Sequence, residues 1–221
     1  ADWTSNTRRC LANGVSIAND RCQSRAEKAL LRFRFKHSSK SEMSYLDLFR
    51  PIKAFVFDVD GVLTDGKVVL LPDGQQMRTV NSKDGYALQL AVRKEYHVAI
   101  ITGGNNLPMK ERMNGLGITD TYLSSSHKNE AMDDFLHSYH LKSHEVMYMG
   151  DDIPDLPALE MVGLPSAPLD ASEEVKSMAK FISKRNGGNG CVREIIELVM
   201  RAHGKWYDAS RDNDNFAEFT W

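Results

Sequence analysis

Short apolar, β-branched runs alternate with longer segments of helical pattern through the middle of the chain. The apolar runs that predict buried strands are 53–59 (KAFVFDV), 98–102 (VAIIT) and 145–149 (EVMYM), with shorter ones at 121–123 and 181–183. Helices are predicted over 84–96, 107–116, 127–139, 155–162, 172–178 and 192–203. This alternation is typical of βαβ units. The pattern therefore predicts an α/β fold with a Rossmann-like parallel sheet flanked by helices.

One short segment between the first predicted strand and the first predicted helix does not follow this alternation. The apolar stretches 68–71 and 77–80 flank Pro72-Asp73-Gly74, where proline fixes the backbone for a turn and glycine closes it. We expect a small β-hairpin there. Neither 66–80 nor 103–126 has room for a separate domain.

The two ends of the chain differ from this body. Residues 1–42 contain nine Lys/Arg and four Asp/Glu, although the whole chain has a formal net charge of −2. They lack the sustained apolar stretch of a secretory signal, so we expect a dispensable basic extension before a folded domain over 43–203. Residues 204–221 are polar with scattered aromatic side chains, which predicts a flexible tail.

Composition narrows the class of protein. Hydrophobic residues make up 42 % and charged residues 26 %, as in ordinary globular proteins, and no apolar run is long enough to span a bilayer. Cys10, Cys22 and Cys191 fit neither a zinc site nor a disulfide framework, which favours a reducing compartment. The part after residue 42 is acidic, which disfavours nucleic acid as a partner. We therefore expect a cytoplasmic protein without a membrane or nucleic-acid partner.

Acidic residues follow two of the predicted strands. Asp58 and Asp60 leave the first strand two residues apart, so their side chains point the same way, and Asp151 follows strand 145–149. The carboxyl ends of parallel strands meet at one edge of a sheet, where ligands bind. Carboxylates brought together there repel one another unless a cation lies between them. The sequence therefore predicts a hard cation, Mg²⁺, with Asp58 and Asp151 as carboxylate ligands.

Further polar residues lie at the same predicted edge. Thr102 and Gly103 end strand 98–102 with a hydroxyl and exposed amides, which suit phosphate oxygens. Lys128, near the start of a predicted helix, would neutralise a phosphate, although a solvated surface lysine is the alternative. Asp152 and Asp155 are candidates to cap the helix opened by Pro154, for Asp155 alongside a role in orienting the metal ligands.

Taken in chain order, these segments resemble the four motifs of the haloacid dehalogenase superfamily: DVDGV (58–62), Thr102, Lys128 and GDDIPD (150–155). The resemblance covers about residues 53–200. It implies that Asp58 attacks phosphorus to form a phospho-aspartyl intermediate, and that Asp60 protonates the leaving alcohol and then activates water. It also implies that Thr102 and Lys128 hold the phosphoryl group, and that Mg²⁺ contacts Asp58, Asp151 and the main-chain carbonyl of Asp60.

Most members of this superfamily cover the site with a cap domain, for which this chain has no room. Segments 81–85 (NSKDG) and 187–194 (GGNGCVRE) resemble the tetrameric 3-deoxy-D-manno-octulosonate 8-phosphate phosphatases. This implies a small anionic sugar phosphate as substrate, a role in lipopolysaccharide precursor synthesis, and a homotetramer with sites at subunit interfaces. It places Gly103, Lys83, Asp84 and Gly85 at the substrate, with a solvated lysine at a helix start as the alternative for Lys83.

One position departs from many of these phosphatases, which have arginine where this chain has Gly104. The nine-carbon analogue, 2-keto-3-deoxynononate 9-phosphate, therefore stays open as substrate. A protein or nucleic-acid phosphatase with an open site and a non-catalytic assembly protein are further alternatives. A receiver domain of two-component signalling uses the same residue types, but it places the metal-binding acids before the phosphorylated Asp.

Overall fold

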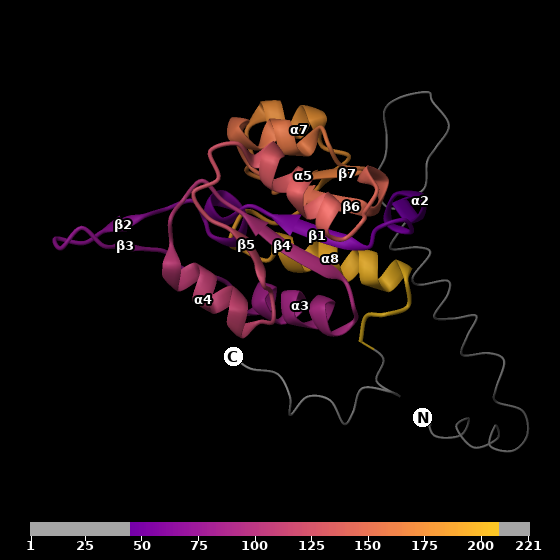
Figure 1. Cartoon of the computed structure of the whole chain (residues 1–221), viewed down its shortest axis with the longest axis horizontal. Coiled ribbons are helices and arrows are strands. Elements are labelled where there is room, and N and C mark those ends of the chain that lie inside the picture. Colours follow the sequence, from indigo (N-terminus) through magenta and orange to yellow (C-terminus); the bar gives the residue numbers. More distant parts are fainter. Residues whose placement is uncertain (1–44, 208–221) are drawn as a thin grey trace, which may run out of the picture. The chain divides into compact units, whose positions relative to one another are not determined.

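The computed structural model of the protein describes residues 45–207. The predictions for 1–42 and for the tail beyond Tyr207 lie outside these residues. Six strands form one parallel sheet in the order β5-β4-β1-β6-β7-β8 (Figure 1). The strands are β1 (Ala54–Phe57), β4 (His97–Ile101), β5 (Asp120–Tyr122), β6 (Val146–Met149), β7 (Leu164–Ala167) and β8 (Phe181–Ile182).

The central strand β1 is buried along its whole length, because helices cover both faces of the sheet. Phe57 at its end lies opposite Ile100 of β4 on one side and Met149 of β6 on the other. The carboxyl ends of these three strands are therefore level with one another. The sequence prediction of a parallel α/β sheet is confirmed.

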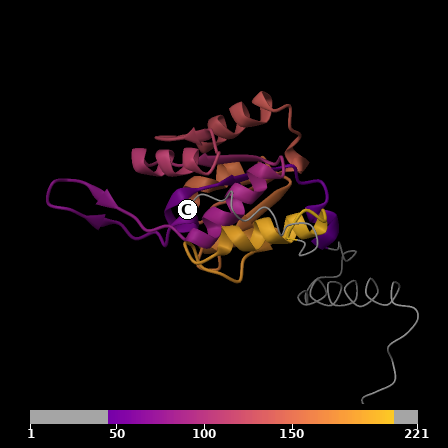
Figure 2. The ribbon, with the colours of Figure 1, turned by 90° about the horizontal axis from the view of Figure 1, so that it is seen from below.

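Helices α5 and α7 lie on one face of the sheet, and α3 and α8 lie on the other (Figures 1 and 2). The helices are α2 (Tyr45–Phe49), α3 (Ser82–Arg93), α4 (Leu107–Gly115), α5 (Lys128–Ser138), α6 (Leu156–Leu159), α7 (Glu173–Met178) and α8 (Cys191–Ala202). Short helical turns form at η1 (Val59–Leu63), η2 (Ser143–Glu145) and η3 (Ile153–Asp155). No helix within residues 45–207 is long and apolar enough to cross a membrane.

The predicted hairpin is present as β2 (Val69–Leu70) and β3 (Gln76–Met77), an antiparallel pair that projects from the rest of the domain in both views (Figures 1 and 2). Its turn is closed by Gly74, whose φ of 85° is favourable only for glycine and whose N–H donates to Leu71 O over 2.9 Å. The strands are shorter than predicted. The apolar side chains of this pair stay largely exposed, with Leu70 at 73 %.

Strand β7 was missed by the sequence reasoning, because its sequence, Leu-Pro-Ser-Ala, contains a proline that cannot donate to a sheet. The structure accommodates Pro165 through its carbonyl, which accepts from Lys180 N–H over 2.8 Å. Its neighbour Ser166 accepts from Gly150 N–H over 3.3 Å. The strand is thus bonded on both sides despite the missing donor.

Helix α3 begins two residues earlier than predicted. The side chain of Asn81 caps it by accepting from Lys83 N–H over 2.9 Å, so that Lys83 and Asp84 lie in its first turn.

Candidate active site

The predicted site residues meet at the carboxyl edge of the sheet because three neighbouring strands end there. Asp58 directly follows β1 and Thr102 directly follows β4, while Asp151 follows β6 after one glycine. Asp58 N–H still donates to Met149 O over 3.0 Å, which prolongs the ladder by one residue and fixes the Asp58 backbone. Asp58 and Thr102 are buried, at 5 % and 3 % exposure. The fold therefore brings Asp58, Thr102 and Asp151, which are far apart in the sequence, to the same edge of the sheet.

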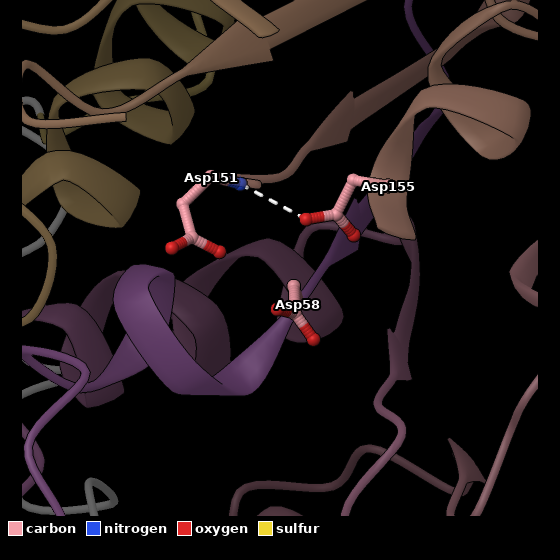
Figure 3. Close-up of side chains that lie close together, drawn as sticks. All are labelled: Asp58, Asp151 and Asp155. Carbon is pink, nitrogen blue, oxygen red and sulfur yellow. Dashed lines mark hydrogen bonds between the residues drawn. The ribbon is translucent and has the colours of Figure 1, made fainter. Parts of the chain in front are cut away.

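Three carboxylates lie together at this edge (Figure 3): one oxygen from each of Asp58, Asp151 and Asp155 lies within 4.8 Å of the others. Both oxygens of Asp155 already have partners. Oδ1 accepts from Lys128 Nζ over 2.6 Å and from Tyr148 Oη over 2.5 Å, and Oδ2 accepts from the N–H groups of Asp151 and Asp152 over 3.0 and 3.3 Å. Asp155 thus binds Lys128 and the backbone of Asp151, and its bond to Asp152 N–H is part of a capping box at η3, so its position fits both predicted roles.

The remaining carboxylates fit a cation. Asp58 Oδ1 is buried and receives no hydrogen bond, although Lys128 Nζ lies 2.9 Å away. Asp151 comes close because residue 61 is glycine: a Cβ there would lie 2.0 Å from Asp151 Oδ2, and the φ of 88° also favours glycine. A buried carboxylate oxygen that is paired with Lys128 and lies next to a second carboxylate matches the oxygen ligands that Mg²⁺ prefers.

Lys128 is the first residue of α5, and its side chain is only 6 % exposed. It contacts both Asp58 and Asp155, so the alternative of a solvated surface lysine is wrong. Burial alone would lower the pKa of Lys128, but the charges of Asp58 and Asp155 outweigh burial and raise that pKa. The ammonium therefore stays charged between the two carboxylates.

The pKa values of Asp58 and Asp151 are also raised, which for a carboxyl group favours the uncharged form. Burial, and then the charge of Asp155, raises the pKa of Asp58, and Lys128 only partly opposes this. Burial, and then the charges of Asp58 and Asp155, raises the pKa of Asp151 to about 7. Without a metal, the two carboxylates therefore retain protons at a pH where ordinary aspartates are ionised.

This shift predicts a pH-dependent effect of Mg²⁺ on stability. The folded-state pKa of Asp151 is raised, so its contribution to stability is fully present below about pH 4 and is lost as the pH rises through about 7. Mg²⁺ binds the ionised carboxylates and opposes this loss. In thermal unfolding, we expect Mg²⁺ to raise Tm much more at pH 8 than at pH 5.5. Equal shifts at the two pH values would contradict the expectation.

Asp60 lies at the outer side of the site, with its side chain 35 % exposed. Its carboxylate accepts from Arg78 Nε over 2.6 Å and from Arg78 Nη2 over 3.0 Å. A Cβ at Gly104 would lie 3.9 Å from Asp60 Oδ2 and 3.6 Å from Thr102 Oγ1. The segment that departs from the resembled phosphatases therefore faces both Thr102 and Asp60. Arg78 was missed by the sequence reasoning, since no motif or period marks it.

A glycine-rich segment before α8 supports the loop that carries Asp58 and Asp60. Gly188 N–H donates to Val62 O over 2.9 Å, and the buried thiol of Cys191 lies 3.3 Å from the same oxygen. At Gly187 a Cβ would lie 1.9 Å from Gly61 O. The two main chains therefore pack against each other with no room for a side chain.

This close contact predicts that Gly187→Ala will displace the loop and lower both stability and the effect of Mg²⁺ on Tm. Overpacking of this kind costs about 1–3 kcal/mol. The matched control is Gly115→Ala at the end of α4, where a Cβ meets no atom within 4 Å and where alanine favours the helix. Unfolding in urea with and without Mg²⁺ measures both variants. Equal stability of the two variants would contradict the close packing.

The four residues predicted to contact substrate differ in their exposure to solvent. Gly103 is exposed, two residues after the end of β4. Lys83 is exposed and lines a groove of about 440 Å³ with Tyr86, Arg193 and Trp206. Asp84 and Gly85 are buried in α3.

Asp84 has a structural partner. Its Oδ1 accepts from Arg193 N–H over 2.7 Å, which joins α3 to the first turn of α8. Its other oxygen, Oδ2, is buried and has no hydrogen-bond partner among the described residues, and the contact of Asp84 and Gly85 with substrate stays a prediction.

Comparison with known proteins agrees with this geometry. Residues 120–195 match the model of the haloacid dehalogenase-like hydrolase family. The chain is 37 % identical over 158 residues to the 3-deoxy-D-manno-octulosonate 8-phosphate phosphatase of Escherichia coli strain K12, covering 72 % of this chain and 84 % of the relative. The crystal structure of the Yersinia pestis phosphatase of that name has a TM-score of 0.71 and 33 % identity, covering 72 % of this chain and 86 % of that one.

A structure of the Moraxella catarrhalis phosphatase, described as a complex with magnesium ion, phosphate ion and KDO, has a TM-score of 0.69 and 30 % identity. It covers 71 % of this chain and 90 % of that one. Sequence identity and coverage of this extent, together with the similarity of the folds, show the family of this chain. The chain belongs to the haloacid dehalogenase-like hydrolases, in the family of these 3-deoxy-D-manno-octulosonate 8-phosphate phosphatases.

Proposed function

We propose that the protein is a Mg²⁺-dependent phosphatase that hydrolyses 3-deoxy-D-manno-octulosonate 8-phosphate to the free sugar acid and phosphate. The observation that carries the proposal is the group of buried Asp58, Asp155 and Lys128 with half-buried Asp151 at the carboxyl edge of the sheet. Similarity to relatives that act on this sugar-acid phosphate supports the choice of substrate.

Asp58 is the nucleophile in this proposal, and Asp60 is the general acid and base. Asp58 is buried on the rigid end of β1 with Lys128 Nζ at 2.9 Å, whereas Asp60 lies farther out, where a leaving alcohol and water have access. Asp58 Oδ attacks phosphorus, and Asp60 gives its proton to the leaving oxygen. Asp60 then takes a proton from the water that cleaves the phospho-aspartyl bond.

The phosphoryl group is held by Thr102 and Lys128. The Thr102 hydroxyl already accepts from Gly104 N–H over 3.1 Å, which leaves its own hydrogen available for a phosphoryl oxygen. Asp58, Asp151 and the main-chain carbonyl of Asp60 would hold Mg²⁺, with Asp152 and Asp155 supporting them. The ion supplies positive charge that offsets the charge on the phosphoryl oxygens.

The proposal also specifies the length of the sugar acid, eight carbons rather than nine. The relatives named above are described for the eight-carbon acid, and the Moraxella catarrhalis structure contains KDO. Gly104 leaves more space beside Thr102 and Asp60 than the arginine of many relatives. The nine-carbon 2-keto-3-deoxynononate 9-phosphate is therefore the competing substrate.

We further propose a homotetramer assembled through the hairpin, with each site close to a neighbouring subunit. Val69, Leu70 and Met77 expose 55 %, 73 % and 53 % of their surfaces on a hairpin that projects from the domain. Apolar residues gathered in this way mark an interaction surface. Sedimentation equilibrium of the full chain tests the proposal: Leu70→Asp should dissociate the tetramer, and a tetramer unchanged by it would contradict the assignment.

Phosphate release tests the enzymatic proposal. The eight-carbon and nine-carbon sugar-acid phosphates are compared with simple sugar phosphates, each with Mg²⁺ and with a chelator. We expect Mg²⁺-dependent release with the highest kcat/KM for the eight-carbon acid. A preference for the nine-carbon acid would replace the substrate, and release from none of the esters would overturn the proposal in favour of a non-catalytic role.

A further inference from the structure

Arg78, the residue after the second strand of the hairpin, contacts the candidate catalytic residue Asp60. It follows β3 directly, and its guanidinium reaches Asp60 with two N–H groups, Nε at 2.6 Å from Oδ1 and Nη2 at 3.0 Å from Oδ2. A third group, Nη1, donates to Gln76 Oε1 over 3.3 Å. The side chain of Arg78 is only 10 % exposed, although the hairpin around it is open to solvent.

This contact fixes the direction of the Asp60 carboxylate. A bidentate pair between arginine and a carboxylate restrains both position and plane, which a single hydrogen bond does not. Among the described residues, the only other side-chain hydrogen bond to the Asp60 carboxylate comes from Thr64 Oγ1, at 3.4 Å. Asp60 follows β1 on the turn η1, where its own φ and ψ are not helical. Arg78 is therefore the main restraint on the orientation of Asp60.

We propose that Arg78 is the positioning residue for proton transfer by Asp60, an inference that rests on the proposed function. Arg78 directs one oxygen of Asp60 toward the leaving oxygen of the substrate. When Asp60 has given its proton to that oxygen, the same two contacts hold the resulting carboxylate in place as the base for the attacking water. The proton that leaves Asp60 in the first step is replaced by one from water in the second.

The role predicts a dependence on the leaving group. An alkyl leaving group, as in a sugar phosphate, needs a proton from Asp60, whereas an aryl leaving group such as p-nitrophenolate departs without one. The ratio kcat/KM reports the steps up to transfer of the phosphoryl group to Asp58. Loss of a residue that directs only proton donation should therefore lower kcat/KM for alkyl esters and spare it for aryl esters.

The experiment uses the full chain with Mg²⁺ and compares three esters: the eight-carbon sugar-acid phosphate, a sugar phosphate without a carboxylate, and p-nitrophenyl phosphate. For Arg78→Ala we expect kcat/KM to fall about 10²-fold on both sugar esters and by less than about threefold on the aryl ester. Arg78→Lys should recover part of the loss, because an ammonium cannot bind both carboxylate oxygens at once. In an Asp60→Asn background, Arg78→Ala should cause no further loss.

Lys67→Ala is the matched control. Lys67 is an exposed lysine just before strand β2 of the hairpin, and its only ion pair within the described residues is with Asp65. This variant should leave all three reactions unchanged. An equal loss on the aryl ester would overturn the proposal, as it would point to phosphoryl binding or a displaced loop. A loss confined to the sugar acid would overturn it in favour of carboxylate binding, and full activity of Arg78→Ala would also overturn it. If the wild-type protein hydrolysed none of the esters, the proposed function would fail together with this inference.

Discussion

Asp58→Asn will reduce Mg²⁺-dependent phosphate release by about 10⁴-fold or more, because the amide oxygen cannot replace the attacking carboxylate. Asparagine has nearly the shape of aspartate. The variant should therefore keep the fold around residue 58, which directly follows β1. Steady-state release from the sugar-acid phosphate measures the effect.

Thermal unfolding separates this chemical effect from damage to the fold. At pH 8 without metal, burial and the charge of Asp155 disfavour an ionised Asp58, as its raised pKa indicates. The metal-free Asp58→Asn variant should therefore be at least as stable as the wild type, while losing most of the stabilisation by Mg²⁺.

Asp65→Asn is the control for Asp58→Asn, because Asp65 lies just beyond the same turn and its only ion pair within residues 45–207 is with the exposed Lys67. It should keep full activity. Substantial activity of Asp58→Asn would refute Asp58 as nucleophile, whereas an unfolded variant would show that the acid holds the loop.

Lys128→Met is expected to have the largest effect on stability. Methionine fills a similar volume but leaves Asp58 and Asp155 buried without their shared cation, and breaking a buried ion pair in this way costs about 3–5 kcal/mol. Urea unfolding without metal measures the loss. Mg²⁺ should raise the stability of this variant more than that of the wild type. Once Lys128 is replaced, no cationic side chain among the described residues of the cluster lies beside Asp58, and Mg²⁺ takes over that role.

Lys53→Met provides the comparison, since Lys53 also forms a short ion pair, at 2.6 Å from Glu145, but is 65 % exposed. Solvent screening limits such a pair to less than about 1 kcal/mol. Similar losses for the two variants would mean that the cluster around Lys128 is far more hydrated than the structure indicates.

The convergence of Asp58, Thr102 and Asp151 could be predicted from the sequence, because each ends a continuous apolar run and parallel strands end at one edge. The burial of Lys128 could not be predicted, since one lysine at the start of a helix has the same sequence pattern whether it is solvated or buried. Its environment depends on Asp155, which approaches only through the turn after β6.

Other features depend on contacts that local sequence does not encode. Arg78 is 18 positions from Asp60, on a hairpin with no period or motif to mark it. Strand β7 contains Pro165, and an isolated proline argues against a strand unless the neighbouring strands are known. The bond from Arg193 N–H to Asp84 Oδ1, which joins α3 to α8, links residues 109 positions apart.

The support of the Asp58 loop by the glycine segment has a consequence for synthesis. The thiol of Cys191 and the carbonyl of Val62 that it contacts are 129 residues apart in the chain. At roughly 5–20 residues per second, a ribosome adds the second partner on the order of ten seconds after the first. Until then the nascent chain has Asp58 on a loop without that support. Hydrolytic activity should therefore appear late, after the sheet has formed and almost the whole domain has left the ribosome.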